Sequence, residues 1–474
     1  MVGVSSRTLS DFIKAYDVRG LVPEQLDAEV ARAIGSAFAE VVAIPAQASA
    51  VVVGYDMRPS SPELSHAFAE GVAGHGLDVV IIGLCSTDGL YFASGSMGLP
   101  GAMFTASHNP AAYNGIKLCR AGASPVGQDS GLAQITEVAQ AIVDGERPVA
   151  PQGVAPGAIG EKDTLEDYAH LLRSLVDLTA IRPLKVVVDA GNGMGGFTVP
   201  AVLQGLPLQV VPLYFELDGT FPNHEANPLD PANIVDLQKA VIEHGADIGL
   251  AFDGDADRCF VVDERGEPVS ASVITALVAV REIGKAVAAG DRPQDVTVVY
   301  NVISSHVVRE VVAEQGATGL RTRVGHSFIK AEMAKANAVF GGEHSAHYYF
   351  RDFWYADTGM LSALHVLAAL GEQNEPLSRL VEQYDRYSAS GEINSTVASV
   401  DEATTRVLDW AAAKNVQVDT LDGITVTSLE PEAPMWWFNL RPSNTEPLLR
   451  LNVEAADDAT MASVRDEVLA VVRS

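Results

Sequence analysis

The chain has 474 residues, 47% of them hydrophobic, and its 61 acidic against 32 basic side chains give a formal net charge of −29. Single hydrophobic cores stop growing well below this length, so we expect several globular domains. The strong negative charge argues against nucleic acid and anionic membrane surfaces as partners, because both are polyanions that the mean field of the chain repels.

The cysteines and the first residues carry no sign of secretion. Cys85, Cys119 and Cys259 lack CxxC spacing and indicate neither a disulfide framework nor a zinc site. Residues 1–14 contain no continuous apolar segment, and the apolar run 276–280 ends at Arg281. We therefore expect a cytoplasmic protein without a membrane segment.

One pattern of apolar strands recurs three times along the chain. In each copy, helical patterns separate the strands, the third strand ends in a polar loop, and a short apolar segment then returns. The predicted strands are 51–53, 79–82, 101–104 and 115–119; 185–189, 208–213, 248–252 and 259–263; and 296–300, 320–324, 338–340 and 348–350. Helical patterns such as 62–75 and 236–244 fit right-handed crossovers. The pattern predicts three similar α/β domains with mixed sheets, and their loops lie at the carboxyl ends of strands, where open α/β sheets bind ligands.

The rest of the chain departs from this pattern. A helix is predicted at 360–370, a linker at 371–376, strands near 392–400, 423–427 and 436–440, and a closing helix from about residue 459. This order predicts a separate α+β domain. We place the four domains at residues 1–153, 154–265, 266–373 and 374–474.

The loop TASHNP at 105–110 places the hydroxyl of Ser107 on a tight polar turn directly after the apolar strand 101–104. A hydroxyl displayed in this way can carry a phosphate. The loop DGDADR at 253–258 also follows an apolar strand and supplies three carboxylates at alternate positions, which face one side of an extended chain. Such oxygen donors suit Mg²⁺, so the two loops together indicate metal-assisted phosphoryl transfer through a serine.

The aspartate loop also fits a second interpretation. The residues at positions one, three, five and twelve of an EF-hand calcium loop would be Asp253, Asp255, Asp257 and Glu264. Arg258 stands where that loop requires glycine, and the flanking segments are strand-like rather than helical. Calcium binding is therefore the weaker hypothesis.

Three further motifs need an interpretation. His344 and His347 have the spacing of a His-x-x-His metal pair, but the position of GEHSAH in the repeat favours a sugar-binding loop. GNGMGG at 191–196 does not give G-x-G-x-x-G and is interpreted as a tight strand-to-helix turn rather than a dinucleotide site. RPSNTEP at 441–447 collects a guanidinium, two hydroxyls and an amide, which is a plausible phosphate cradle.

TASHNP, DGDADR, GEHSAH and RPSNTEP, in this order and spread over the whole chain, resemble the motifs of the α-D-phosphohexomutases, specifically the bacterial phosphomannomutase/phosphoglucomutase group. The resemblance implies four domains around a central cleft. It also implies an intramolecular phosphotransferase that interconverts the 1-phosphate and 6-phosphate of mannose and/or glucose through a phosphoserine and a 1,6-bisphosphate intermediate.

The resemblance implies a role for each loop in the reaction. Ser107 would hold the phosphoryl group. The metal contacts would be Ser107, Asp253, Asp255 and Asp257. Arg258 and Lys117 would be the catalytic cations, since phosphoryl transfer requires alignment and neutralisation of spread negative charge. The acid–base groups for either sugar hydroxyl would be His108, Lys117 and His347.

The substrate-binding residues that the resemblance implies are Tyr16, Arg19, His326, Glu343, Ser345, His347, Arg441, Ser443, Asn444 and Thr445. Glu343 and Ser345 would hold sugar hydroxyls, and the Arg441 loop would clamp the phosphate that is not reacting. Related mutases often carry a lysine after the first strand of the third repeat, where this chain reads NVISS at 301–305. We expect that phosphate contact to be supplied differently, through water or His326.

The expected cofactors are Mg²⁺ and glucose or mannose 1,6-bisphosphate as activator and intermediate. The expected partner is a small phosphosugar, with neither nucleic acid nor membrane, and the chain is expected to be a monomer or a homodimer. The alternatives are a phosphoglucosamine mutase, which Asn444 and His344 disfavour, and a catalytically inactive phosphosugar-binding protein, which the intact Ser107 and aspartates disfavour.

Overall fold

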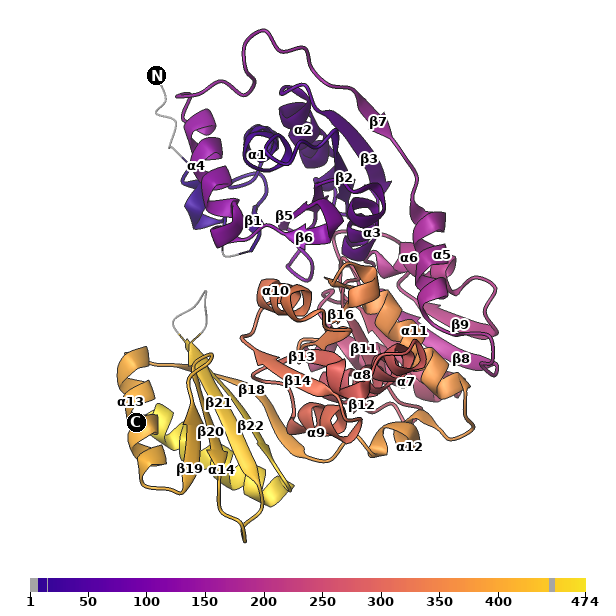
Figure 1. Ribbon diagram of the computed structural model, residues 1–474, viewed down its shortest axis with the longest axis vertical. Coiled ribbons are helices and arrows are strands. Elements are labelled where there is room, and N and C mark those ends of the chain that lie inside the picture. The colour runs from indigo at the N-terminus through magenta and orange to yellow at the C-terminus, as the bar shows by residue number, and fades with distance from the viewer. Residues whose placement is uncertain (1–6, 15, 443–447) are drawn as a thin grey trace. The chain divides into compact units, whose positions relative to one another are not determined.

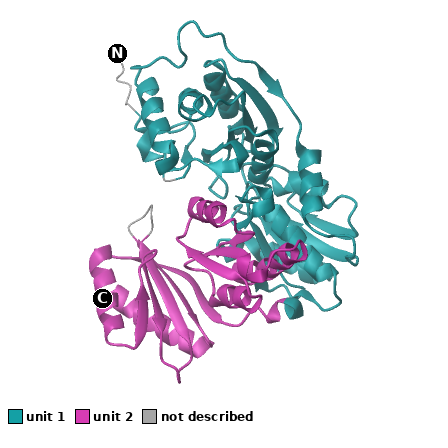
Figure 2. Ribbon diagram, viewed as in Figure 1, with its two compact units in different colours: residues 1–269, 345–380 teal, residues 270–344, 381–474 magenta. Residues whose placement is uncertain are grey.

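The computed structural model describes residues 7–14, 16–442 and 448–474. The chain forms two compact units: unit 1 comprises residues 1–269 and 345–380, and unit 2 comprises residues 270–344 and 381–474 (Figure 2). None of the helices in the described part of the chain combines the length and the apolar character that a membrane span requires.

The first sheet of unit 1 is mixed. Its strand order is β1-β5-β4-β2-β3-β7, with β6 paired to β5 (Figure 1). Strand β2 runs parallel to β3 and β4, whereas β5 returns antiparallel to β4, as the sequence predicts. Strand β5 also pairs antiparallel with β1, which the sequence analysis did not predict. The strands are β1 (Val18–Leu21), β2 (Ala50–Tyr55), β3 (Asp78–Leu84), β4 (Gly101–Phe104), β5 (Tyr113–Arg120), β6 (Ser124–Pro125) and β7 (Ile159–Glu161).

Helices cover both faces of this sheet. The helices are α1 (Ala28–Phe38), α2 (Ser61–Ala73), α3 (Thr87–Met97) and α4 (Leu132–Val143). Val51 and Val53 pack into one core cluster with residues of α1, α2 and α4, whereas Val52 packs into another with Leu90 and Ala93 of α3. Successive side chains of a strand point to opposite faces, so the unbroken apolar run of β2 reflects burial on both sides.

The second sheet of unit 1 is also mixed and has the strand order β12-β11-β10-β8-β9. Strand β10 is parallel to β8 and antiparallel to the returning β11. Its strands are β8 (Leu184–Asp189), β9 (Leu208–Leu213), β10 (Ile248–Phe252), β11 (Cys259–Val262) and β12 (Pro268–Val269), and its helices are α5 (Leu165–Leu175), α6 (Gly195–Leu203) and α7 (Val235–His244). GNGMGG forms the predicted turn between β8 and α6, with Asn192 at a φ of 60°.

The second segment of unit 1 begins at Ser345, within GEHSAH. It contains the antiparallel pair β16 (Tyr348–Phe350) and β17 (Ala356–Asp357), and then the buried helix α11 (Gly359–Gly371). Helix α12 (Leu377–Glu382) follows the predicted linker. Short 3₁₀ or π turns are Leu9–Asp11, Ala39–Ala43, Ala121–Ala123, Gln128–Ser130, Pro231–Ile234, Pro293–Asp295 and Arg351–Phe353.

Unit 2 begins with a third α/β layer. Strands β13 (Thr297–Asn301), β14 (Thr318–Thr322) and β15 (Phe340–Gly342) are parallel, with β13 in the middle. The helices are α8 (Ala271–Ala288), α9 (His306–Glu314) and α10 (His326–Ala336).

The C-terminal part of unit 2 is an antiparallel sheet with two helices. The strand order is β18-β22-β21-β20-β19, with β18 (Ser388–Thr396), β19 (Val416–Asp419), β20 (Ile424–Ser428), β21 (Trp436–Pro442) and β22 (Leu448–Ala455). Helices α13 (Val400–Ala412) and α14 (Asp458–Val472) contribute to its hydrophobic core. The predicted class, α/β with a C-terminal α+β part, is confirmed.

Several predicted boundaries are wrong by a few residues. The strand expected at 320–324 is β14 at 318–322, because Val324 has left the sheet and donates its main-chain N–H to Asp422. The strand expected at 338–340 is β15 at 340–342, which continues through two glycines. The strand expected near 392–400 ends at Thr396, because Ser399 caps the start of α13.

Candidate active site

Ser107 stands on the loop that connects β4 to β5, in an unusual backbone conformation. Its φ is 49°, in the left-handed region that non-glycine residues rarely adopt, and its main-chain N–H donates to Thr105 Oγ1 at 2.9 Å. The side chain is buried, and its hydroxyl donates to Asp253 Oδ2 at 2.8 Å. The serine loop and the aspartate loop therefore meet.

The aspartate loop follows β10 and holds its carboxylates close together. Asp253, Asp255 and Asp257 are all buried, and one oxygen from each lies within 4.8 Å of the others. Gly254 lies so close to the serine loop that an added Cβ would stand 2.4 Å from Ser107 O. Only a glycine at this position allows the two loops to approach this closely.

Two cations partly balance the three carboxylates. Lys117 Nζ donates to Asp255 Oδ2 at 2.7 Å and to Asp257 Oδ2 at 2.6 Å, and Arg258 Nε donates to Asp253 Oδ2 at 2.8 Å. Burial alone would lower the pKa of Lys117, but the charges of Asp255 and Asp257 outweigh it and raise that pKa well above its usual value. Lys117 is therefore held as an ammonium.

The carboxylates titrate differently from one another. Burial raises the pKa of Asp253 to about 6, against the opposing charge of Arg258. Burial would also raise the pKa of Asp257, but the charges of Lys117 and His347 hold it well below its usual range. The cluster therefore combines one carboxylate whose pKa lies near 6 with one that stays ionised at all moderate pH values.

The donor set fits a hard divalent cation. Three carboxylates and the Ser107 hydroxyl offer only oxygen ligands, which Mg²⁺ prefers. Asp255 Oδ1 is buried and has no hydrogen-bond partner among the described residues, while Oδ2 of the same carboxylate accepts from Thr87 Oγ1 at 2.6 Å. An oxygen left in this way is available to a metal ion.

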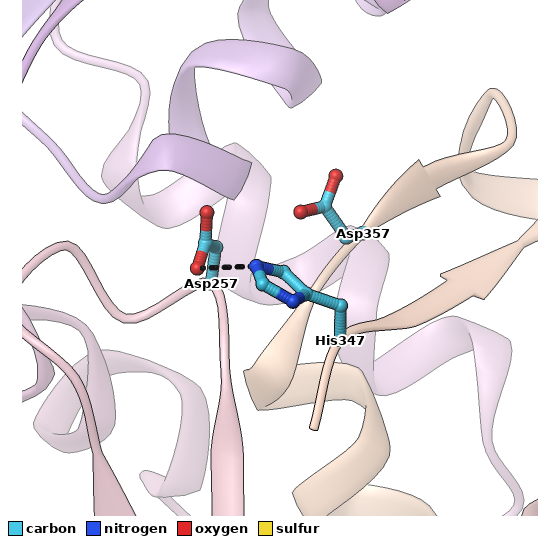
Figure 3. A group of neighbouring side chains, drawn as sticks. All are labelled: Asp257, His347 and Asp357. Carbon is cyan, nitrogen blue, oxygen red and sulfur yellow. Dashed lines mark ion pairs between the residues drawn. The ribbon is translucent and has the colours of Figure 1, made fainter. Parts of the chain in front are cut away.

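His347 belongs to the same site through a second acidic cluster. Its Nε2 lies 3.5 Å from Asp257 Oδ1 (Figure 3). Its Nδ1 lies 3.0 Å from the hydroxyl of Ser345. Burial would lower the pKa of His347, but the charge and hydrogen bond of Asp257 and the charge of Asp357 raise it above its ordinary value. Asp357 lies beside the ring, and the sequence analysis missed it.

His108 also lies next to Ser107. Its Nδ1 is 3.3 Å from Ser107 Oγ, and burial, together with the charges of Arg258 and Arg19, lowers its pKa well below the usual value. His108 is therefore neutral near pH 7. Arg19, on β1, donates to Asn109 Oδ1 of the same loop at 2.7 Å, and Tyr16 lies half-buried just before β1.

The remaining predicted substrate residues lie in unit 2. Glu343 Oε1 accepts from Asn301 Nδ2 at 3.1 Å and from the main-chain N–H of Gly325 at 3.2 Å, which places it beside the start of α10, where His326 stands. The side-chain amide of Asn301, the first residue of NVISS, is therefore already hydrogen-bonded to Glu343.

Arg441 stands near the end of β21, where a glutamate holds its side chain. Its Nη2 donates to Glu392 Oε2 at 2.9 Å, and Arg450 Nη1 donates to the other oxygen of Glu392 at 3.0 Å. The predicted phosphate ligands Ser443, Asn444 and Thr445 lie outside the described residues.

The structure does not assemble an EF-hand or a histidine metal pair from the described residues. Glu264, the twelfth position of the calcium loop, accepts from Ser378 Oγ at 2.6 Å and does not join the carboxylate cluster. His344 lies 3.4 Å from the hydroxyl of Ser272 and belongs to neither group of candidate metal ligands.

Sequence reasoning also missed Arg58 and Thr87, which hydrogen-bond to the serine loop and the aspartate loop respectively. Thr87 bonds to Asp255, and Arg58 Nη2 donates to Ser107 O at 3.0 Å. A weak signal existed for Arg58, since a cation two residues after Asp56 in a strand-end loop is a candidate for a buried role. Thr87 begins a helix and carries no comparable signal.

Comparison with known proteins gives a consistent result along the chain. Residues 11–144, 166–266, 274–387 and 392–471 match, in turn, alpha/beta/alpha domains I, II and III and the C-terminal domain of phosphoglucomutase/phosphomannomutase. The chain is similar to "Phosphohexose mutases" of Xanthomonas campestris pv. campestris, with 39% identity over 456 residues that cover 96% of this chain and 97% of the relative.

The chain is also similar to the phosphomannomutase of Escherichia coli (strain K12), with 37% identity over 463 residues that cover 96% of this chain and 97% of the relative. Among solved structures, it resembles the crystal structure of a phosphoglucomutase/phosphomannomutase family protein from Burkholderia thailandensis. The TM-score is 0.84 at 31% identity, and the match covers 97% of this chain and 96% of that one.

Proposed function

Because the chain belongs to the phosphoglucomutase/phosphomannomutase family, whose members are phosphoryl-transferring isomerases, we propose that it interconverts the 1-phosphate and 6-phosphate of mannose and/or glucose. In the proposed cycle a phosphoserine at Ser107 donates its phosphoryl group to the sugar. The hexose 1,6-bisphosphate that results turns around and returns its other phosphate to the serine. We also propose the four domain boundaries given above and glucose or mannose 1,6-bisphosphate as activator.

One observation carries this proposal. The hydroxyl of Ser107 donates to Asp253, within a cluster of three buried carboxylates. The cluster also contains the partly buried ammonium of Lys117 and the buried guanidinium of Arg258. Phosphoryl transfer requires that the attacking and leaving oxygens are aligned and that the charge on the phosphoryl oxygens is stabilised. It requires little further covalent chemistry from the protein. A hydroxyl in these surroundings suits that task.

Asp253, Asp255, Asp257 and the oxygen of Ser107 would hold Mg²⁺. The ion, when bound, supplies neutralisation of the phosphoryl charge. Arg258 adds a guanidinium that is fixed in place by Asp253 at 2.8 Å. In each transfer the P–O bond to one oxygen breaks as the bond to the other forms, and Arg258 attracts the equatorial oxygens throughout.

Each transfer also moves a proton. The attacking sugar hydroxyl gives up its proton to a nearby basic group, and the leaving Ser107 oxygen takes one up, with the reverse in the second half-reaction. We propose that His108, Lys117 and His347 share this work. His108 Nδ1 lies 3.3 Å from Ser107 Oγ, which puts an imidazole next to the oxygen that exchanges the proton. The carboxylates keep Lys117 as an ammonium beside the same loops.

We propose that Glu343 and Ser345 bind sugar hydroxyls, that Tyr16, Arg19 and His326 contact the substrate, and that Arg441 with Ser443, Asn444 and Thr445 binds the phosphate that is not reacting. The position of Arg441 supports this role, because Glu392 orients its guanidinium through a hydrogen bond to Nη2 at 2.9 Å. Phosphate recognition by a guanidinium depends on such orientation.

The proposal is tested by intact mass. The protein is treated with glucose 1,6-bisphosphate and Mg²⁺, and we expect a mass increase of one phosphoryl group that maps to Ser107. Ser107→Ala should abolish both the mass shift and turnover, whereas Ser174→Ala, at an exposed serine of α5, should change neither. An unmodified Ser107 in an active enzyme would contradict the phosphoserine mechanism.

Substrate preference is tested by direct assay. Mannose 1-phosphate and glucose 1-phosphate should turn over faster than glucosamine 1-phosphate. The opposite order would replace the proposed substrate class with the hexosamine phosphates.

A further inference from the structure

Arg58 is a buried arginine on the loop between β2 and α2, and its guanidinium hydrogen-bonds to the main chain of the serine loop. Its side chain is 1% exposed. Its guanidinium donates to four main-chain oxygens: Nη1 donates to Pro110 O and Tyr113 O, both at 2.9 Å, and Nη2 donates to Ser107 O at 3.0 Å and to Asn109 O at 2.7 Å. One guanidinium thus joins four carbonyls between residues 107 and 113.

The surroundings of Arg58 hold its guanidinium in place. Its Nε lies 3.2 Å from Asp56 Oδ2. Its Cζ lies over the ring of Phe221, 5.1 Å from the ring centroid. Asp56 is itself fixed, because its Oδ1 accepts from Ser61 Oγ at 2.6 Å. The guanidinium is planar and rigid, so its position defines where the four carbonyls can lie.

The serine loop needs such support. Ser107 has a φ of 49°, and a non-glycine residue persists in this region only when its surroundings hold it there. Arg58 hydrogen-bonds to the carbonyl of that same residue. It also bonds to the three carbonyls of Asn109, Pro110 and Tyr113, which lead the chain into β5, and these contacts together determine where Ser107 Oγ points.

We infer that Arg58 is a positioning residue for phosphoryl transfer, which holds the loop 107–113 so that Ser107 Oγ faces Asp253 and the phosphoryl acceptor. The inference rests on the proposed function of Ser107. Arg58 does not touch the reacting atoms, because its bonds end on main-chain oxygens. Its effect is therefore on the rate of transfer rather than on sugar binding.

Arg58→Lys is the test variant. Lysine keeps one positive charge for Asp56 but lacks the planar fork that reaches four carbonyls. The matched control is Arg173→Lys, because Arg173 Nη1 also donates to two main-chain oxygens, Ala201 O at 2.7 Å and Val202 O at 3.1 Å, at a site in unit 1 that serves α6.

The first measurement is single-turnover phosphorylation of the dephosphorylated protein by glucose 1,6-bisphosphate, followed by intact mass. A displacement of about 1 Å at the nucleophile costs about 100-fold in rate, so we expect Arg58→Lys to slow transfer about 100-fold. KM for the hexose phosphate should change by less than about threefold, since ground-state binding is retained. Arg173→Lys should transfer at the wild-type rate. A wild-type rate in Arg58→Lys overturns the inference.

The second measurement does not depend on catalysis. Hydrogen exchange of the peptide that covers residues 105–113 should be faster in Arg58→Lys and unchanged in Arg173→Lys. If the wild-type protein never becomes phosphorylated, the proposed function fails, and this exchange alone decides whether Arg58 holds the loop. Unchanged exchange in Arg58→Lys overturns the inference in either case.

A paired variant covers the possibility of misfolding. Asp56→Asn with Arg58→Gln removes both buried charges together, so neither charge is left buried without its partner. The pair should fold and show the same slow transfer and fast exchange as Arg58→Lys. Wild-type transfer in the pair overturns the inference.

Discussion

The hydroxyl of Ser107 donates to Asp253 Oδ2 at 2.8 Å across 146 residues of chain. Because the hydroxyl donates its proton to Asp253, the oxygen lone pairs can face a phosphoryl group or His108 Nδ1, which lies 3.3 Å away. Arg258 bonds to the same carboxylate oxygen at 2.8 Å, so the nucleophile and a cation share one anchor. This arrangement places charge neutralisation next to the atom that is proposed to carry the phosphate.

Thr87→Val should weaken Mg²⁺ binding. Thr87 Oγ1 donates to Asp255 Oδ2 at 2.6 Å and its main-chain N–H donates to Asp255 O at 3.0 Å, which orients that carboxylate. Loss of a contact that orients a metal ligand typically lowers metal affinity about 10- to 100-fold. Calorimetric titration with Mg²⁺ measures the change directly.

Two variants control the Thr87 experiment. Thr87→Ser keeps the hydroxyl and should retain most of the affinity. Thr136→Val removes a threonine hydroxyl that donates to Leu132 O within α4 and should leave Mg²⁺ binding unchanged. Equal affinity in Thr87→Val and the wild-type protein would show that Asp255 needs no such support.

Lys117→Met should make the stability of unit 1 depend on Mg²⁺. Lys117 bonds to Asp255 and Asp257 at 2.7 and 2.6 Å, and both carboxylates are fully buried. Removing one partner of a buried ion pair costs about 3–5 kcal/mol, because the charge left behind has no partner. Urea unfolding without Mg²⁺ should show this loss in the free energy of unfolding, and Mg²⁺ at about 100 times its Kd should restore about 2.7 kcal/mol.

Lys239→Met provides the comparison for Lys117. Lys239 pairs with Asp236 at 3.5 Å on an exposed face of α7, and exposed pairs contribute about 0–1 kcal/mol. Its removal should change stability little, with or without Mg²⁺. If Lys117→Met is as stable as Lys239→Met in chelator, the carboxylate cluster does not need the ammonium.

Arg441→Lys should raise KM for the hexose phosphate about tenfold and change kcat less, because a lysine cannot replace a guanidinium that is oriented for two-point phosphate contact. Glu392 bonds to Arg441 at 2.9 Å and to Arg450 at 3.0 Å. Arg450→Lys is therefore the matched control, and steady-state kinetics should show a KM close to that of the wild-type protein. A larger KM in the control than in Arg441→Lys would move the phosphate role to Arg450.

The sequence predicts the strands and the loops far better than the side-chain contacts that support those loops. Apolar runs such as 248–252 identify buried strands, and the loops that follow them lie at the carboxyl ends, so the meeting of Ser107 with Asp253 could be anticipated. Arg58 and Thr87 could not be assigned. Their partners lie 49 to 55 and 168 residues away, and no local periodicity encodes such pairings.

Boundaries failed where a local contact overrides the apolar pattern. Val324 reads as part of a strand, yet its N–H bonds to Asp422 in a distant segment of unit 2. Gly341 and Gly342 read as a strand end, yet they continue β15 because side chains of α10 and α8 fill the space beside them. Tertiary contacts of this kind decide the last residues of an element, and they are invisible in a window of neighbouring residues.

His306→Phe should flatten the pH dependence of unit 2 stability on the acid side. The His306 ring is 7% exposed and stacks on Trp437 at 4.9 Å, and burial, with the charges of Arg309 and Arg321, lowers its pKa to about 3. The folded protein thus holds His306 neutral, whereas the unfolded chain protonates it below its ordinary pKa of about 6.5. The unfolded state then binds more protons, so this contribution to stability is complete above pH 6.5 and is lost as pH falls toward 3. Between pH 6.5 and 5 the loss amounts to about 2 kcal/mol, at about 1.4 kcal/mol per pH unit.

Urea unfolding followed by tryptophan fluorescence at pH 7 and pH 5 measures this loss. Phenylalanine keeps the stacking on Trp437, so the variant should be similar to the wild-type protein at pH 7 and more stable than it at pH 5. His66→Phe alters an exposed histidine of α2, which meets water in both states, and should follow the wild-type curve. If His306→Phe and the wild-type protein lose the same free energy between the two pH values, His306 is protonated in the folded protein without cost, and the environment that Trp437, Arg309 and Arg321 create does not exclude the charge.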